Sequence, residues 1–151
     1  MLPAAKVVER VTEVVPFLRV SDMERSVRYY VDGLGFTITN KWVPDGKLRW
    51  CWMIKGRAAL MLQEFWRDGN PGGRPDGSLG QGVSLVFQCE DALAIYRDVT
   101  SRNIAATEPF VGNALWTFSL CDPDGYRLEF ASPTDVPEET KLSEVEGQGT
   151  S

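Results

Sequence analysis

The chain contains no histidine. An iron site built on two imidazoles and one carboxylate is therefore excluded, as is a serine nucleophile activated by an imidazole base. Its three cysteines, Cys51, Cys89 and Cys121, are widely spaced, lack a CxxC pattern and fall in predicted strands. We interpret them as small core residues in a reducing cytosol, which predicts a cytoplasmic location.

Long apolar runs and basic patches are missing too. No run approaches the roughly 18 residues of a membrane span, and the first residues show no signal-peptide pattern. The formal net charge is -5, and residues 133–151 carry five acids against one base, Lys141. The rest of the chain is close to neutral, so we expect neither a membrane nor a nucleic-acid partner. Residues 133–151 predict an acidic, flexible C-terminal tail.

The first part of the chain predicts one strand, a helix and three more strands. Residues 11–20 are apolar and β-branched, which is typical of a strand buried on both sides. Ser21-Asp22-Met23-Glu24 then predicts a capping box with Ser21 as the N-cap. The helix that follows ends at Gly33 and Gly35, and three strands are expected at 36–43, 48–55 and 57–65.

The second part repeats this order after a glycine-rich stretch. Residues 67–82 hold six glycines and two prolines, which indicates a linker (67–81) or a mobile flap, and we favour the linker. A strand at 83–89 and a helix ending at Asn103 follow. Three strands are then expected at 105–110, 115–121 and 126–131, the last two joined by the turn Asp122-Pro123-Asp124-Gly125.

The order is therefore βαβββ twice, and an offset of 69 residues superimposes Asp22 on Asp91 and Gly56 on Gly125. We predict an α+β fold: a single domain (1–132) made of two βαβββ modules, about 13–66 and 82–132. Each module gives a curved sheet with its helix on one side. Two such sheets would form a partly open, barrel-like cleft.

Three sequence motifs occupy key places in this plan. They are Arg19-Val20-Ser21-Asp22 with Glu24 to Val27 and Tyr29-Tyr30 behind it, Leu34-Gly35-Phe36, and Asp122 to Glu129. Together they resemble the vicinal oxygen chelate superfamily, which has the glyoxalase/bleomycin-resistance fold. It includes lactoylglutathione lyase, extradiol dioxygenases, fosfomycin-resistance transferases and bleomycin-resistance proteins.

The resemblance implies a divalent metal held by the first and last strand of each module. Those positions fall here on Val15, Leu60, Ser84 and Glu129, of which only Glu129 matches the family pattern. Without histidine an extradiol dioxygenase is excluded. A lyase or isomerase would have to use Glu129, with Glu64 as a possible second oxygen donor. We therefore predict no cofactor and no metal.

Two features could form a ligand site. Glu129 is a carboxylate in mid-strand, and it either pairs with Arg19 or Arg127 or contacts a polar or cationic ligand group. Trp50 and Trp52 share one strand face, which indicates a core or dimer interface, or a platform for a flat ligand.

We predict a metal-independent small-molecule binding protein of the bleomycin-resistance type, with antibiotic sequestration as one possibility. The alternative is the metal-dependent lyase or isomerase, and a third reading is a structural or partner-binding module. The expected ligand-binding residues are Phe17, Arg19, Trp50, Trp52, Leu60, Glu64, Ser84, Gln88 and Glu129. The resemblance also implies a homodimer, and pairing of modules within or between chains is left open.

Overall fold

Two four-stranded sheets of the same strand order make up most of the computed structural model, which describes residues 9–67 and 70–149. The first sheet has the order β1 (Phe17–Val20), β4 (Ala58–Glu64), β3 (Trp50–Lys55), β2 (Thr37–Trp42). The second has the order β7 (Ser84–Gln88), β10 (Arg127–Pro133), β9 (Leu115–Cys121), β8 (Phe110–Gly112). In both sheets the first pair is parallel and the others are antiparallel. The predicted α+β class and doubled βαβββ order are confirmed, and within these residues neither sheet closes into a barrel.

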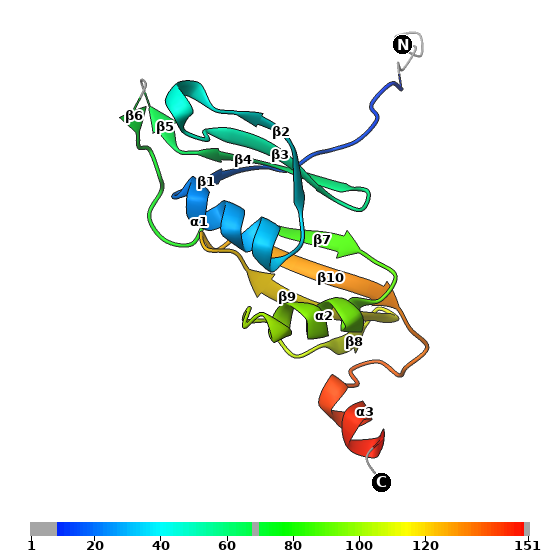
Figure 1. Cartoon of the computed structure of the whole chain (residues 1–151). Helices are drawn as coiled ribbons and strands as arrows, with labels where there is room; N and C mark the ends of the chain where they lie inside the picture. The colour runs from blue at the N-terminus through cyan, green and yellow to red at the C-terminus, as the bar shows by residue number, and fades with distance from the viewer. Residues whose placement is uncertain (1–8, 68–69, 150–151) are drawn as a thin grey trace, which may run out of the picture.

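Each sheet carries its helix on one side (Figure 1). Helix α1 (Met23–Val27) continues as a π-helical turn, η1 (Arg28–Gly33), and α2 (Ala92–Ser101) belongs to the second module. The N-cap of α1 is Asp22, not the predicted Ser21, because the Ser21 side chain bonds to Asp124 instead. Smaller elements are η2 (Pro44–Gly46), β5 (Trp66–Arg67), β6 (Asn70–Pro71) and α3 (Leu142–Gly149).

Two strands begin elsewhere than the sequence predicts. β1 starts only at Phe17, and Val11 and Val14 before it are 89% and 90% exposed. Because β1 pairs with β4 alone and has one covered face, the expected burial on both sides is not found. β8 starts at Phe110, because the turn at Asn113 and Ala114, both with positive φ, fixes which residues pair with β9.

Residues 134–142, within the segment expected to be a flexible tail, contact the second sheet, and α3 follows them. The backbone N–H groups of Val111 and Glu139 bond to the carbonyls of Thr140 and Val111. Leu142 is buried at the start of α3. The acidic composition of the segment does not indicate these contacts, because they are made by backbone groups and by the Leu142 side chain.

One aromatic chain runs through the core of both modules. Tyr30 packs edge-on against Phe36, and Phe36 against Phe87 across the module boundary, with ring centroids 5.7 and 6.0 Å apart. Phe87 stacks on Phe130, which stacks on Phe118. The two modules therefore share one apolar core.

The Asp122–Gly125 turn of the second module holds the first module by buried carboxylates. Asp124 has a fully buried side chain that accepts bonds from the Ser21 backbone N–H (3.1 Å) and hydroxyl. Asp122 accepts a bond from the Tyr30 hydroxyl at 2.7 Å. Burial raises the pKa of Tyr30, and the Asp122 carboxylate raises it further. These contacts join residues about a hundred positions apart and link the two modules.

Part of the predicted linker covers this turn. Leu79 is buried and its N–H bonds to the Asp124 carbonyl, while Arg74 donates to the Ser21 hydroxyl and pairs with Asp124 at 3.6 Å. We call residues 74–80 the strap. Residues 68 and 69 of the expected linker lie outside the described residues.

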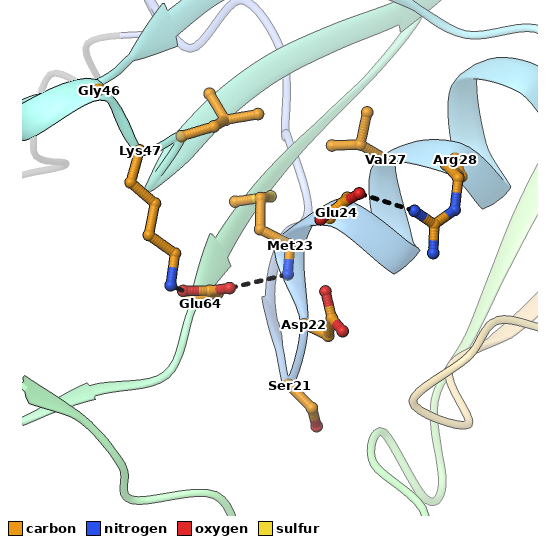
Figure 2. Close-up of a pocket in the computed structure, with 10 residues that line it drawn as sticks. Ser21, Asp22, Met23, Glu24, Val27, Arg28, Gly46, Lys47 and Glu64 are labelled. Atoms are coloured by element: carbon orange, nitrogen blue, oxygen red, sulfur yellow. Dashed lines mark hydrogen bonds and ion pairs between the residues drawn. The ribbon is translucent and has the colours of Figure 1, made fainter.

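Glu64 anchors the start of α1 to the end of β4 (Figure 2). One carboxylate oxygen accepts the Met23 backbone N–H at 2.9 Å. The other lies 2.9 Å from the Arg49 guanidinium and 3.5 Å from the Lys47 ammonium. Arg49 in turn lies over the Trp66 ring. Because this carboxylate is almost buried, all of its partners are needed to offset its desolvation.

Gly125→Ala should destabilise the protein more than Gly46→Ala. Both glycines have positive φ, so each substitution costs about 1 kcal/mol in backbone strain. A Cβ on Gly125 would also lie 2.9 Å from the Ser78 Cβ of the strap, whereas Gly46 faces open space. We expect a further loss of about 1–2 kcal/mol for Gly125→Ala in urea unfolding. Equal losses would show that the strap does not press on the turn.

Glu64→Gln should cost about 2 kcal/mol of unfolding free energy, because it leaves Arg49 without its charged partner. The matched control is Glu24→Gln on α1, the helix that Glu64 anchors. Glu24 pairs with Arg28 on the surface, so its replacement should cost less than about 0.5 kcal/mol. Thermal and urea unfolding of both variants compare the two costs directly, and similar values would contradict an anchoring role for Glu64.

Candidate functional site

Each sheet has one face covered by the core and one open face. In β1, Leu18 and Val20 are buried, whereas Phe17 and Arg19 are exposed. In β3, Trp50 and Trp52 are half-buried and alternate with buried Cys51 and Met53. The first open face is the side of the first sheet that bears Phe17, Arg19, Trp50, Trp52, Ile54, Met61 and Gln63.

Strand register arranges these side chains in two rows. Gln63 of β4 lies between Arg19 and Trp50. Met61 lies between Phe17 and Trp52 in the same way. The Arg19 guanidinium lies 4.5 Å from the centroid of the Phe17 ring. The first open face is thus an aromatic and apolar surface that carries the Arg19 cation and the Gln63 amide.

The second open face is formed by the equivalent side of the other sheet. It bears Ser84, Val86, Gln88, Phe110, Thr117, Arg127 and Glu129. A hollow of about 340 Å³ lies over it, lined by Val86, Phe110 and Glu129 among others. This face therefore has a concave centre with one carboxylate.

Glu129 is paired within its own strand. Its carboxylate lies 2.9 Å from Arg127 Nε, and the two side chains are 25% and 54% exposed. Of the two expected partners the structure selects Arg127, and Arg19 stacks on Phe17 instead. The reason is that Arg19 and Glu129 lie on different sheets, whereas Arg127 and Glu129 are two residues apart on one face.

The four positions that the sequence resemblance implies for a metal ion carry side chains that do not fit a metal site. Val15 and Leu60 have no donor atoms, Ser84 offers a neutral hydroxyl, and Glu129 is held by Arg127. Within residues 9–67 and 70–149 no three Cys, Asp or Glu side chains converge as a metal-binding group. The donor set therefore does not support a metal-dependent step.

Leu60 and Glu64 lie on the covered side of the first sheet. Leu60 is fully buried, and Glu64 lines a separate hollow of about 680 Å³ between α1 and residues 46–48 (Figure 2). Glu64 and Glu129 are on different sheets, so the structure does not bring the two oxygen donors of the alternative reading together. The sequence spacing correctly predicts that Glu64 and Leu60 share one face of β4, but this face packs against helix α1.

A third hollow, of about 850 Å³, lies where the modules meet on the side away from the strap. Leu60, Ser84, Gln88 and Cys89 line it. Burial raises the pKa of the Cys89 thiol above its usual range. At neutral pH this thiol is protonated and is a poor nucleophile. The hollow offers a binding volume without an activated group.

By sheet face the nine expected site residues separate into three groups, and Leu60, Ser84 and Gln88 also line the third hollow. Phe17, Arg19, Trp50 and Trp52 meet on the first open face, and Ser84, Gln88 and Glu129 on the second. Leu60 and Glu64 belong to the covered side. Sequence reasoning missed Met61, Gln63, Val86 and Phe110, although period-two alternation with buried leucines and phenylalanines would have indicated most of them.

None of the described helices is long and apolar enough to cross a membrane. A search of curated proteins found no match to this chain. Among solved structures, the antibiotic-binding protein TnmS3 from Streptomyces sp. CB03234 is 20% identical, with a TM-score of 0.61 over 82% of this chain and 98% of that one.

Two further structures have the same fold. A bleomycin resistance determinant encoded on the transposon Tn5 is 21% identical, with a TM-score of 0.62 over 83% of this chain and 100% of that one. The bleomycin-binding protein from Streptomyces verticillus, complexed with copper(II)-bleomycin, is 19% identical, with a TM-score of 0.61 over 82% and 97%. At this level of identity the likeness establishes the fold.

The sequence profile of one family matches residues 10–130, which is most of the chain. The strand order of this chain, its duplicated modules and its structural neighbours agree with this match. The chain belongs to the Glyoxalase/Bleomycin resistance protein/Dioxygenase superfamily.

Proposed function

We propose that this protein binds a small, partly aromatic molecule on its open sheet faces without a metal ion, as an antibiotic-sequestering protein would. The observation that carries the proposal is the combination of an intact scaffold with an aromatic open face and metal positions occupied by Val15, Leu60 and Ser84. Sequestration requires affinity alone and no reacting group.

The chemistry of the first open face supports this role. Trp50 and Trp52 are adjacent on one face and can stack on a planar ring, and Phe17 and Met61 extend the apolar area. Gln63 supplies hydrogen-bonding groups that orient a ligand. Structural neighbours described as antibiotic-binding and bleomycin-binding proteins make an antibiotic a reasonable ligand class.

We further propose that a second copy covers these faces, so that the first open face of one chain and the second open face of another enclose the ligand. The first face exposes Phe17 and Ile54, and the second exposes Val86 and Phe110. Large apolar side chains gathered on open sheets are typical of an interface. Such a dimer would turn two shallow faces into an enclosed cleft.

Saturable quenching of tryptophan fluorescence should occur with at least one compound among bleomycin, an anthraquinone antibiotic and other planar aromatics. Trp52→Leu should weaken that binding by roughly tenfold, since it removes a stacking surface. Trp66→Leu is the control, because that ring packs on Arg49 at the Glu64 side. Binding should be unchanged by a chelator. No binding by any compound up to ~1 mM would contradict the proposal.

Analytical ultracentrifugation should give a mass near twice that of one chain. Val86→Asp on the second open face should shift the protein toward the monomer, because it places an unpaired carboxylate in the interface. Asp98→Asn on α2, remote from both open faces, serves as the control. A wild-type protein that stays monomeric at micromolar concentration would contradict the dimer.

A further inference from the structure

We infer that the first open face selects ligands carrying an anionic group, such as a carboxylate or sulfonate, next to their aromatic rings, and that Arg19 binds this group. The inference rests on the proposed ligand-binding function and specifies its ligand class. It differs from a role for Glu129 as the anchor of a cationic ligand.

Arg19 differs from most arginines of the described chain in having no carboxylate partner. The arginines that pair with an acid within the described residues are Arg25, Arg28, Arg49, Arg74, Arg97, Arg102 and Arg127. The Arg19 guanidinium lies over the Phe17 ring. Arg10 and Arg57 also lack an acid partner among these residues, but they lie in the N-terminal segment and in a turn. Among the arginines whose side chains the structure describes, Arg19 is therefore the unpaired one on a sheet face.

The first open face also lacks any acid that could neutralise Arg19. Glu64 is the one carboxylate in the described strands β1 to β4, and it lies on the covered side. Lys41 and Lys55 alternate with the open-face residues and so belong to the other side. The face therefore carries the positive charge of Arg19 in the same rows as Trp50 and Trp52.

The neighbours of Arg19 favour an anion that is attached to a ring. Its guanidinium is held over Phe17, so its donors are positioned at the edge of the aromatic surface. Gln63, the partner of Arg19 across the strand pair, brings an amide donor to the same row, and Trp50 follows it. A planar ligand stacked on Trp50 and Trp52 would place a ring substituent within reach of both donors.

The second open face does not offer a competing charge. Its one carboxylate, Glu129, is already paired with Arg127 at 2.9 Å. A cationic ligand group would have to displace Arg127 to bind there, whereas an anionic group can bind Arg19 without breaking an ion pair. Charge complementarity therefore favours an anionic aromatic molecule over a cationic one.

The test compares two probes with the same ring system and different charge. 1-Anilinonaphthalene-8-sulfonate is anionic, and N-phenyl-1-naphthylamine lacks only the sulfonate. The wild-type protein should bind the sulfonate at least about tenfold more tightly, because a charge-assisted hydrogen bond is added. Arg19→Gln should bring the ratio of the two affinities close to one and leave the affinity for the neutral probe unchanged.

Arg57→Gln is the control, since Arg57 is an unpaired arginine beside the junction hollow. It should keep the wild-type ratio. A ratio that survives Arg19→Gln but falls in Arg57→Gln would place the anion in that hollow and overturn the inference. Thermal melting of both variants checks that they are folded.

The remaining outcomes separate this inference from the proposed function. If both probes bind with equal affinity, the face binds aromatic ligands but Arg19 selects no anion, and only the inference fails. If neither probe binds, the proposed function fails as well. Arg19→Gln could instead lower the mass measured in solution and leave the ratio of the two probe affinities unchanged. Arg19 would then bind a carboxylate of a second copy, and the inference would be overturned.

Discussion

The rest of the structure depends on two buried carboxylates in one turn. Asp122 and Asp124 accept hydrogen bonds from Tyr30 and Ser21, so the last hairpin of the second module holds the first strand and helix of the first. Breaking a buried, charged contact of this kind costs about 3–5 kcal/mol, a large share of the stability of a domain this size. Because these contacts and the shared aromatic core lie on the helix side, the opposite faces of both sheets stay open.

The duplication explains why the two sides of the junction differ. The Gly56 turn and the Gly125 turn are equivalent in the repeat, but only the second carries aspartates, and only the second is covered by the strap. The equivalent space beside the Gly56 turn is not filled by a strap, and it forms the third hollow. The turn of the second module thus joins the two modules, whereas the diverged turn of the first module leaves a hollow between them.

Local sequence patterns predict much of the fold. Most of the wrong predictions involve contacts between residues far apart in the sequence, which no local pattern contains. The turn at Asp122–Gly125, the N-terminal position of Asp91 and the left-handed Asn103 are set by neighbouring residues, and sequence alone indicates them. The Ser21–Asp124 contact spans 103 residues, so a capping box was the natural but wrong interpretation of Ser21. For Trp50 and Trp52, the alternating residues Cys51 and Met53 are also apolar, and periodicity therefore could not say which face is covered. For Glu64, the alternating leucines Leu60 and Leu62 do indicate that its face of the strand is the covered one.

We propose that the ligand binds on the first open face of a scaffold whose metal positions offer too few donor atoms to hold an ion. A crystal structure of the protein with a bound planar aromatic compound tests this most directly. The account predicts ring density stacked on Trp50 and Trp52, with no metal ion beside Glu129. Density confined to the hollow beside Glu64 or to the junction hollow, with the tryptophans bare, would contradict it.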